Sequence, residues 1–487
     1  MCPPGRFSSN GLGDCTTCPP ETYTAVNQST ECHACPTPAV AVNCHDGRVY
    51  AETGYWLFQQ GTEIAVSACP IGLCAGGSQA GSDQCGPNRL VAADNVLCGQ
   101  CAPGYAQWST SCVKCEENNG GLITAALFLL WAYVVLVHLL AQVSQDGKGH
   151  VGIFFYFVQT FLLISPNEIR SLDWLAVINF SPHQSSSGFC LGPWSGTTKL
   201  AVQLLLVPLA LLLLVMTGLI HRALQTLPRI RARIGKVSRN AYIRTCLSIG
   251  MLSYTHVCHT SLQFLYCVDV GPQWRVVFND PSVSCQSGEY TGYQVLACLF
   301  LIFHGFLFPM ALAWMLYRHR DTLLKFRTEV REGSPRPLEL RVHRQMRKRF
   351  GIVYEPFRDA CMAWQMMIFG RRLALAFLAI WLQSQWSARS AIVTFFNMLV
   401  LLVHRMAHPY VSRVHNDLET TALVLIVLAS VLMAAYPSPI PLGVNVLLVL
   451  LLVVPVFCFV IWLVHHKYSM ARAERAARAR STPTVHV

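Results

Sequence analysis

The sequence predicts an all-α polytopic membrane bundle of about nine transmembrane helices, with a small disulfide-rich extracellular domain at its N-terminus. Three observations support this fold class. The chain of 487 residues is 53% hydrophobic but only 13% charged, whereas soluble domains carry about 25% charged residues. Its mean hydropathy is +0.39, and long uncharged segments recur after residue 120. By contrast, 13 of its 21 cysteines lie before Glu116.

Residues 1–120 form the predicted extracellular domain. Many cysteines in a short segment rich in Gly, Pro and Thr indicate disulfides, and therefore an oxidising compartment. Zinc is the alternative for the C-x-x-C pairs, but their exported setting and the spacing of 10–13 residues between pairs favour disulfide loops, so no metal is expected. The cysteines expected to be disulfide-bonded here are Cys2, Cys15, Cys18, Cys32, Cys35, Cys98, Cys101, Cys112 and Cys115.

A glycosylation sequon and the cysteine count give further information on the export of this domain. Asn27 begins the sequon Asn27-Gln28-Ser29, which predicts N-glycosylation. The odd number of cysteines before Glu116 indicates either a partner upstream of Met1 or one free thiol. Because Cys2 follows Met1 without a basic and apolar signal segment, we favour missing upstream residues; a first span that acts as signal anchor is the alternative.

The cysteines are arranged as a repeat. Cys15-x-x-Cys18-Pro-Pro-Glu-Thr-Tyr is followed by Cys32-x-x-Cys35-Pro, and the later pairs at Cys98 and Cys112 repeat the spacing. These segments resemble the ephrin-receptor-like and TNF-receptor-like cysteine-rich modules. The resemblance implies a module that senses an extracellular ligand or matrix.

The membrane orientation follows from Tyr293–Tyr317, about 25 residues without Lys, Arg, Asp or Glu, which is long enough to cross a bilayer. The strongly basic loop 319–358 follows it, and basic residues collect on the cytoplasmic side. Alternation along residues 121–466 then puts the N-terminus outside or in a lumen and the basic tail 467–487 in the cytoplasm. We expect a plasma membrane or an endomembrane location. The predicted spans are Leu122–Val143, Val151–Ile164, Leu200–Ile220, Tyr242–Tyr266, Tyr293–Tyr317, Ala360–Leu382, Ala391–Val403, Leu418–Ala435 and Val444–Val464.

Cysteines also occur in the outer loops. Cys267 and Cys285 flank one loop and are expected to pair with each other. Cys190, in another outer loop, is a candidate for contact with the extracellular domain.

Polar side chains inside the spans are costly and are therefore functional candidates. Helical spacing puts His256, His259 and Gln263 on one face, which either lines a pathway or forms interhelical hydrogen bonds. His304 is a further candidate for the pathway lining. Gly305 and Pro309 predict a kink, which either gates or only shapes packing.

Basic residues suggest contacts with anionic lipid head groups. Arg371 and Arg372 lie inside the predicted span Ala360–Leu382, so this segment is expected either to start as an interfacial helix from Tyr354 or to let the arginines snorkel towards the inner face. Arg347, Lys348 and Arg349 belong to the cytoplasmic loop. A pure topology signal is the alternative. Asn416 and Glu419 predict a capping box at a helix start; a cation-coordinating acid is the alternative for Glu419.

Several function classes are disfavoured. The sequence contains no P-loop, H-E-x-x-H, G-x-S-x-G or kinase motif set, so no enzyme activity and no cofactor are expected. The net charge of +12 does not indicate nucleic-acid binding, because the basic residues lie beside apolar spans.

The helical part resembles a known family. His404–Leu418, HRMAHPYVSRVHNDL, and Phe350–Phe357, FGIVYEPF, are similar to motifs of the TRP-like (transient receptor potential-like) C-terminal domain. Arg371-Arg372-Leu373 and the Tyr266–Cys285 segment add to the resemblance. It implies a cation channel or a channel-like transporter of the flavin-carrier type.

We therefore expect a cation channel or channel-like transporter with an extracellular sensing module. The alternatives are a receptor or adhesion protein whose bundle anchors and signals, and a protein that moves lipids between leaflets. The expected partners are the bilayer with its anionic lipids, inorganic cations, and an extracellular ligand or matrix. Homo-oligomerisation stays open.

Overall fold

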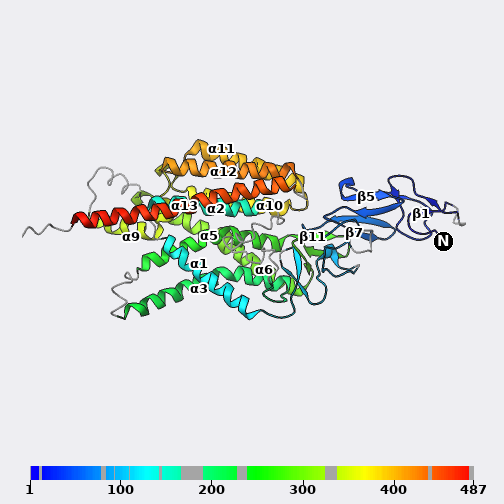
Figure 1. The fold of residues 1–487 in the computed structure, drawn as a ribbon, viewed down its shortest axis with the longest axis horizontal. Helices are drawn as coiled ribbons and strands as arrows, with labels where there is room; N and C mark the ends of the chain where they lie inside the picture. Colours follow the sequence, from blue (N-terminus) through cyan, green and yellow to red (C-terminus); the bar gives the residue numbers. More distant parts are fainter. Residues whose placement is uncertain are drawn as a thin grey trace, which may run out of the picture.

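The computed structural model describes residues 2–9, 14–77, 84–92, 94–108, 110–141, 145–165, 190–227, 238–323, 337–436 and 441–481. A cysteine-rich module built from β-hairpins lies at one end of an elongated molecule, and a bundle of long helices makes up the rest (Figure 1). Residues 324–336 of the predicted cytoplasmic loop and 482–487 of the tail lie outside the described residues.

The module consists of short antiparallel hairpins strung along the chain. Because such strands bury little apolar surface, two small clusters around Tyr23 and around Trp56 and Leu97 form its core, and disulfides connect successive turns. The paired strands are β1 (Arg6–Phe7) with β2 (Thr16–Thr17), β3 (Thr22–Tyr23) with β4 (His33–Ala34), β5 (Val42–His45) with β6 (Arg48–Ala51), β7 (Tyr55–Gln60) with β8 (Glu63–Ala68), and β9 (Tyr105–Trp108) with β10 (Ser111–Lys114).

The predicted disulfide framework is confirmed. All the cysteines expected to pair do so, together with Cys44, Cys69, Cys74, Cys85 and Cys190, which the sequence did not single out for disulfides. The pairs are Cys2–Cys15, Cys18–Cys32, Cys35–Cys44, Cys69–Cys74, Cys85–Cys98, Cys101–Cys112, Cys115–Cys190 and Cys267–Cys285.

The odd cysteine of the module has its partner downstream. Cys115 pairs with Cys190, 75 residues later in the chain. The expectation of an upstream partner or a free thiol was therefore wrong, because a cysteine outside the module completes the count. Asn27, the predicted glycosylation site, is exposed in a turn.

Each predicted span coincides with a helix over most of its described residues; the largest difference is at Ala360–Leu382, whose helix begins only at Trp364. The helices are α1 (Gly120–Leu140), α2 (Gln145–Ile164), α3 (Gly196–Gln225), α5 (Arg239–Leu265), α6 (Gly288–Phe300) continued by the π-helical turn η5 (Leu301–Leu307) and α7 (Phe308–Arg318), α9 (Pro337–Tyr354), α10 (Trp364–Trp381), α11 (Trp386–Ala407), α12 (Arg413–Ala435) and α13 (Leu442–Ser481).

The prediction of about nine membrane spans is not confirmed. Among the described residues, six helices are long and apolar enough to cross a membrane: α1, α3, α6 with η5 and α7, α11, α12 and α13. The apolar part of α2, Gly149–Ile164, is short. Helix α5 is rich in polar residues, and α10 carries Arg371 and Arg372. The chain is therefore a membrane protein whose bundle also contains helices that length and composition alone do not qualify as spans.

Helix α5 runs through the middle of the bundle (Figure 1). It packs against α1, α3 and α6 on one side and against α9 and α10 on the other. Helices α2, α10, α11, α12 and α13 share a second apolar core, so α2 lies beside helices far from it in sequence. Because other helices surround α5, its polar side chains are buried in protein.

The module is docked onto the bundle through the sheet β11 (Cys267–Val270), β12 (Trp274–Val277) and β13 (Asp280–Ser284), which follows α5. Trp274 meets Trp56 and Phe58 of β7 with ring centroids 6.1 and 6.4 Å apart, and Val270 and Val276 belong to the same apolar cluster.

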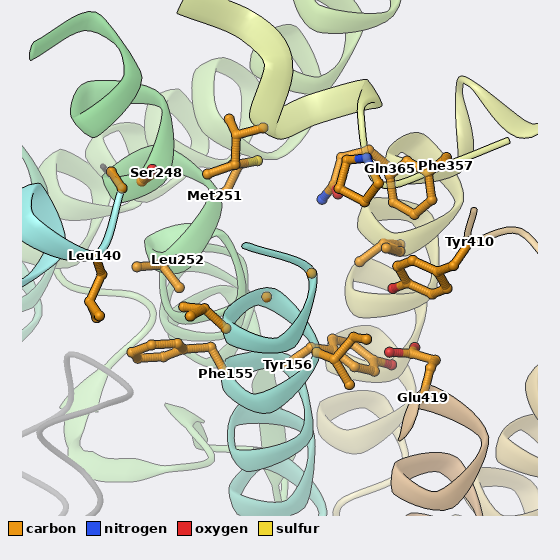
Figure 2. Close-up of a pocket in the computed structure, with 18 of the residues that line it drawn as sticks. Leu140, Phe155, Tyr156, Ser248, Met251, Leu252, Phe357, Gln365, Tyr410 and Glu419 are labelled. Atoms are coloured by element: carbon orange, nitrogen blue, oxygen red, sulfur yellow. The ribbon is translucent and has the colours of Figure 1, made fainter. Parts of the chain in front are cut away.

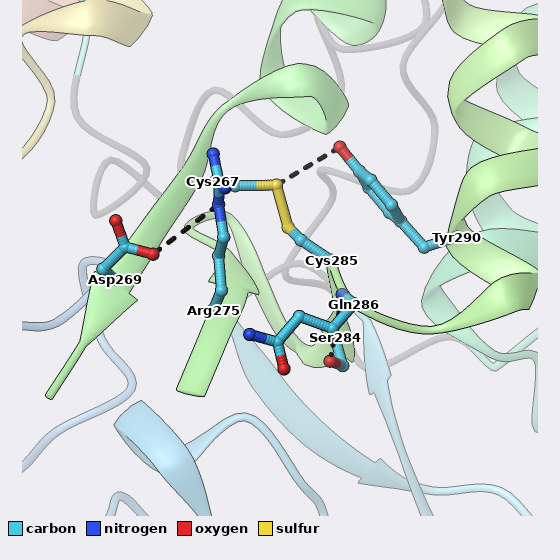
Figure 3. A network of polar contacts seen from close by, with 7 residues as sticks. All are labelled: Cys267, Asp269, Arg275, Ser284, Cys285, Gln286 and Tyr290. Atoms are coloured by element: carbon cyan, nitrogen blue, oxygen red, sulfur yellow. Dashed lines mark hydrogen bonds and ion pairs between the residues drawn. A yellow bond between two sulfur atoms is a disulfide. The ribbon is translucent and has the colours of Figure 1, made fainter. Parts of the chain in front are cut away.

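The Cys267–Cys285 disulfide closes this sheet. Figure 3 shows Tyr290 of α6 with its hydroxyl 3.2 Å from Cys267 Sγ, and Arg275 paired with Asp269 at 3.6 Å. The Tyr290 hydroxyl also lies 3.3 Å from the Phe264 carbonyl of α5. The sheet is therefore attached to both α5 and α6.

Replacing Cys190 with serine tests the link between module and bundle. We expect Cys115 to become alkylated when the purified C190S protein is denatured without reductant, and peptide mass mapping to detect the modified thiol. In the wild type Cys115 should stay unmodified, as it should in the control C458S, which removes a free cysteine. Alkylated Cys115 in the wild type would contradict the pairing.

Candidate functional site

Buried polar side chains of α5 form a column through the bundle. Ser253, Thr255, His256 and Thr260 are all less than 5% exposed. His256 Nε2 donates to the Gln203 carbonyl of α3 at 3.3 Å. Polar groups buried away from water must find such partners inside the protein.

Helix α2 supplies partners for the other side of the column. The Thr255 hydroxyl lies 3.5 Å from Gln159 Oε1, and Gln159 Nε2 donates to the Leu252 carbonyl at 2.7 Å. Gln159 is fully buried. Gln159 and Gln203 were not predicted from the sequence, although each is a polar residue within an apolar helix, and that position is the signal that indicates them.

A polar cavity of about 140 Å³, called here the outer cavity, lies at the end of the column nearest the module. Its lining includes Gln203 and Lys199 of α3, Thr260 and Gln263 of α5, and Asp280 of β13. Trp108 and Thr110 of the module contribute as well. Of the predicted pathway residues, Gln263 thus lines a cavity, His256 is buried between helices, and His259 is partly buried.

Arg89 holds the module side of this region in place. Its Nη1 donates to the Cys98 carbonyl at 2.6 Å and its Nη2 to the Thr110 carbonyl at 2.8 Å. Burial lowers the pKa of the Arg89 guanidinium to about 10, which leaves it charged at neutral pH. Thr110, in the turn between β9 and β10, therefore reaches the cavity from a fixed position.

A second cavity, of about 110 Å³, lies at the other end of the column and is called here the inner cavity. Its lining includes Ser248 and Met251 of α5, Tyr156 of α2, and Arg371 and Arg372 of α10. Gln365, Tyr410 and Glu419 complete its polar wall (Figure 2).

Two arginines are held inside the bundle at this cavity. Arg371 forms an ion pair with Glu419 of α12, and its guanidinium lies 3.7 Å from the centre of the Tyr156 ring. Arg372 Nη1 donates to the Met251 carbonyl of α5 at 2.9 Å. Their exposed fractions are 8% and 6%.

This placement differs from the expectation that Arg371 and Arg372 snorkel to the inner face. The physical reason is that Glu419, which the sequence offered as a cap or a cation ligand, supplies the counter-charge inside the bundle. Asn416 is not the helix cap either: α12 begins at Arg413, and the Asn416 side chain binds the Tyr410 backbone through both N–H and C=O.

The basic residues of α9 lie near the bundle surface. Arg347 and Lys348 are exposed. Arg347 pairs with Glu355 at 2.5 Å, and Arg349 Nε donates to Asn240 Oδ1 at 2.7 Å. Contact of Arg347, Lys348 and Arg349 with anionic lipids stays a prediction.

The kink predicted at Gly305 and Pro309 coincides with the π-helical turn η5. Pro309 cannot donate to the Gly305 carbonyl four residues before it. The Tyr254 hydroxyl of α5 donates to that carbonyl instead, at 2.9 Å. His304 Nε2 lies 3.2 Å from the Ser253 hydroxyl and donates to the Gly250 carbonyl at 3.1 Å, so it contacts α5 too.

Comparison with known protein families identifies one part of the chain. Residues 5–43 match the family described as tyrosine-protein kinase ephrin type A/B receptor-like. This part of the N-terminal module is ephrin-receptor-like. Comparisons with curated proteins and with solved structures give no match. The match confirms the cysteine-rich resemblance for this segment, and the TRP-like resemblance of the helices stays a prediction.

The hydrogen bond from Tyr254 to Gly305 can be tested with a double-mutant cycle. Y254F should lower the stability of the purified protein by about 1 kcal/mol, because a buried carbonyl loses its donor. In a P309A background, where residue 309 regains its N–H, the loss should be smaller. Unfolding in mixed detergent micelles measures both values, and equal losses would show that the tyrosine does not compensate for the proline.

The buried ion pair gives a second stability prediction. E419Q should lower the free energy of unfolding by about 3–5 kcal/mol, because it leaves the Arg371 charge buried without a counter-charge. The double variant R371M/E419L removes both charges and should lower it by less than R371M or E419L alone. The control E116Q breaks the exposed pair with Lys114 and should cost less than about 1 kcal/mol. The same unfolding assay applies; a loss for E419Q no larger than for E116Q would contradict the buried pairing.

Proposed function

We propose that this protein is a channel-like transporter whose pathway follows α5, with the cysteine-rich module over its outer mouth. The observation that carries the proposal is a pair of cavities beside α5, one near its middle at residues 248–252 and one near its C-terminal end at residues 260–264, with buried polar side chains between them. Polar groups inside a membrane are costly. A bundle that only anchored the module would therefore not be expected to contain a column of buried polar side chains.

The column is closed in this structure. Ser253 and His256 between the cavities are at most 1% exposed, so water does not reach them. Opening requires the helices beside α5 to move. The π-helical turn η5 is suited to such movement because α-helical hydrogen bonding is interrupted there, and it contacts α5 through Tyr254 and His304.

The proposed orientation in the membrane follows from the position of the basic helices. Helix α9 and the end of α13 lie at the opposite end of the molecule from the module (Figure 1). We propose that this end is cytoplasmic and that the module faces outside or into a lumen, in a plasma membrane or an endomembrane.

The proposed transported species is a small ion. The TRP-like resemblance implies a cation. The charged residues that line the two cavities carry both signs: Lys199 and Asp280 at the outer one, and two arginines with Glu419 at the inner one. Flux therefore has to be compared for cations and anions.

A receptor is the second candidate. It is favoured by the attachment of the module to α5 and α6 through Trp274 and the Cys267–Cys285 sheet. A ligand bound to the module could bias the bundle through these contacts without any ion passing.

Flux through the purified protein in liposomes separates the two. We expect potassium, sodium, calcium or chloride flux in the wild type, reduced about tenfold or more by H256A or Q263A, which remove polar groups from the column. The control Q294A changes an exposed residue of α6 and should leave flux unchanged. Absence of flux with every ion, from protein with native disulfides, would reject the transporter proposal and favour the receptor.

A further inference from the structure

The inner cavity carries more positive charge than its own carboxylate balances. Among the described residues that line it, the charged ones are Arg371, Arg372 and Glu419. Arg371 and Glu419 neutralise each other as a pair. Arg372 has no carboxylate at ion-pair distance in the described part of the chain; its Nη1 is bound to the Met251 carbonyl.

The polar groups of this wall are also incompletely satisfied. Arg371 Nε, Arg372 Nε and Glu419 Oε2 are buried and have no hydrogen-bond partner among the described residues. Unpaired buried groups of this kind cost free energy and indicate a bound water, ion or ligand. Arginine suits an anionic oxygen, because its planar guanidinium donates several hydrogen bonds in a fixed geometry.

The cavity has an apolar side as well. Figure 2 shows Leu140, Phe155 and Leu252 on one side of it, and Tyr156, Tyr410 and Glu419 on the other. A volume of about 110 Å³ holds several water molecules. A small charged group therefore fits against the arginines, and an alkyl chain fits against Leu140 and Phe155.

We propose that the inner cavity binds the anionic phosphate or carboxylate group of an amphipathic molecule. Arg372 supplies the uncompensated charge, Gln365 lies in the same wall and offers an amide, and Tyr156 stacks on the guanidinium groups. Such a ligand bridges α2, α5, α10 and α12. The inference concerns the inner end of the proposed pathway but does not depend on flux, because binding is measured directly.

The test uses the purified full-length protein and short-chain lipids. We expect dioctanoyl phosphatidic acid to bind, and dioctanoyl phosphatidylcholine, whose head group is zwitterionic, to bind about tenfold or more weakly in a calorimetric titration. R372Q should weaken phosphatidic acid binding about tenfold or more, because hydrogen bonds to a charged group are lost.

A second variant guards against misfolding of R372Q. Q365E adds a negative charge to the cavity wall at a partly exposed residue and should weaken binding to a similar extent. R48Q is the matched control: it removes an exposed positive charge of the cysteine-rich module, away from the cavity, and should leave the affinity within about twofold of the wild type. The elution profile and disulfide content establish that each variant is folded.

Inorganic phosphate distinguishes the two sources of the anionic group. Weaker binding of phosphate than of phosphatidic acid supports an amphipathic ligand. Equal affinities that both fall in R372Q and Q365E support the anion site with a free anion as its ligand. No binding of either probe, or binding that R372Q and Q365E leave unchanged, overturns the proposal. Binding without ion flux would reject the transporter alone.

Discussion

The ion pair between Arg371 and Glu419 constrains the packing of the inner half of the bundle. Its two members come from α10 and α12, the Tyr156 ring of α2 covers the guanidinium, and Arg372 beside it reaches the Met251 carbonyl of α5. A buried charge that loses its partner costs several kcal/mol. These four helices therefore have few alternative arrangements, and the polar column of α5 is held beside α2 as part of the same arrangement.

The bundle has two parts, and α5 and α10 join them. One part contains α1, α3 and α6, and the other contains α2 with α11, α12 and α13. The two cavities lie where these parts meet α5, one beside its middle and one near its C-terminal end. A relative movement of the two parts would change both cavities, since each takes wall residues from more than one helix.

Local chemistry was predictable from the sequence, but long-range pairing was not. Cysteine density gave the disulfide-rich module, and runs such as Tyr293–Tyr317 gave the helices, because composition and periodicity act over a few turns. Pairing of Arg371 with Glu419 or of Cys115 with Cys190 depends on how distant segments pack. The two arginines were therefore expected at the lipid surface, and Tyr254, whose partner is the Gly305 carbonyl, gave no sequence signal of that role.

The docking of the module also determines how mechanical load would be transmitted. Covalently, the module joins the bundle at α1 and, through Cys115–Cys190, at the segment before α3. Noncovalently, Trp56 and Phe58 hold the sheet that connects α5 to α6. A pull on the module is thus shared among four helices and includes the central one. A module attached by a single flexible linker would pull on one helix alone, so in this architecture a force on the module is transmitted to the helix that carries the polar column.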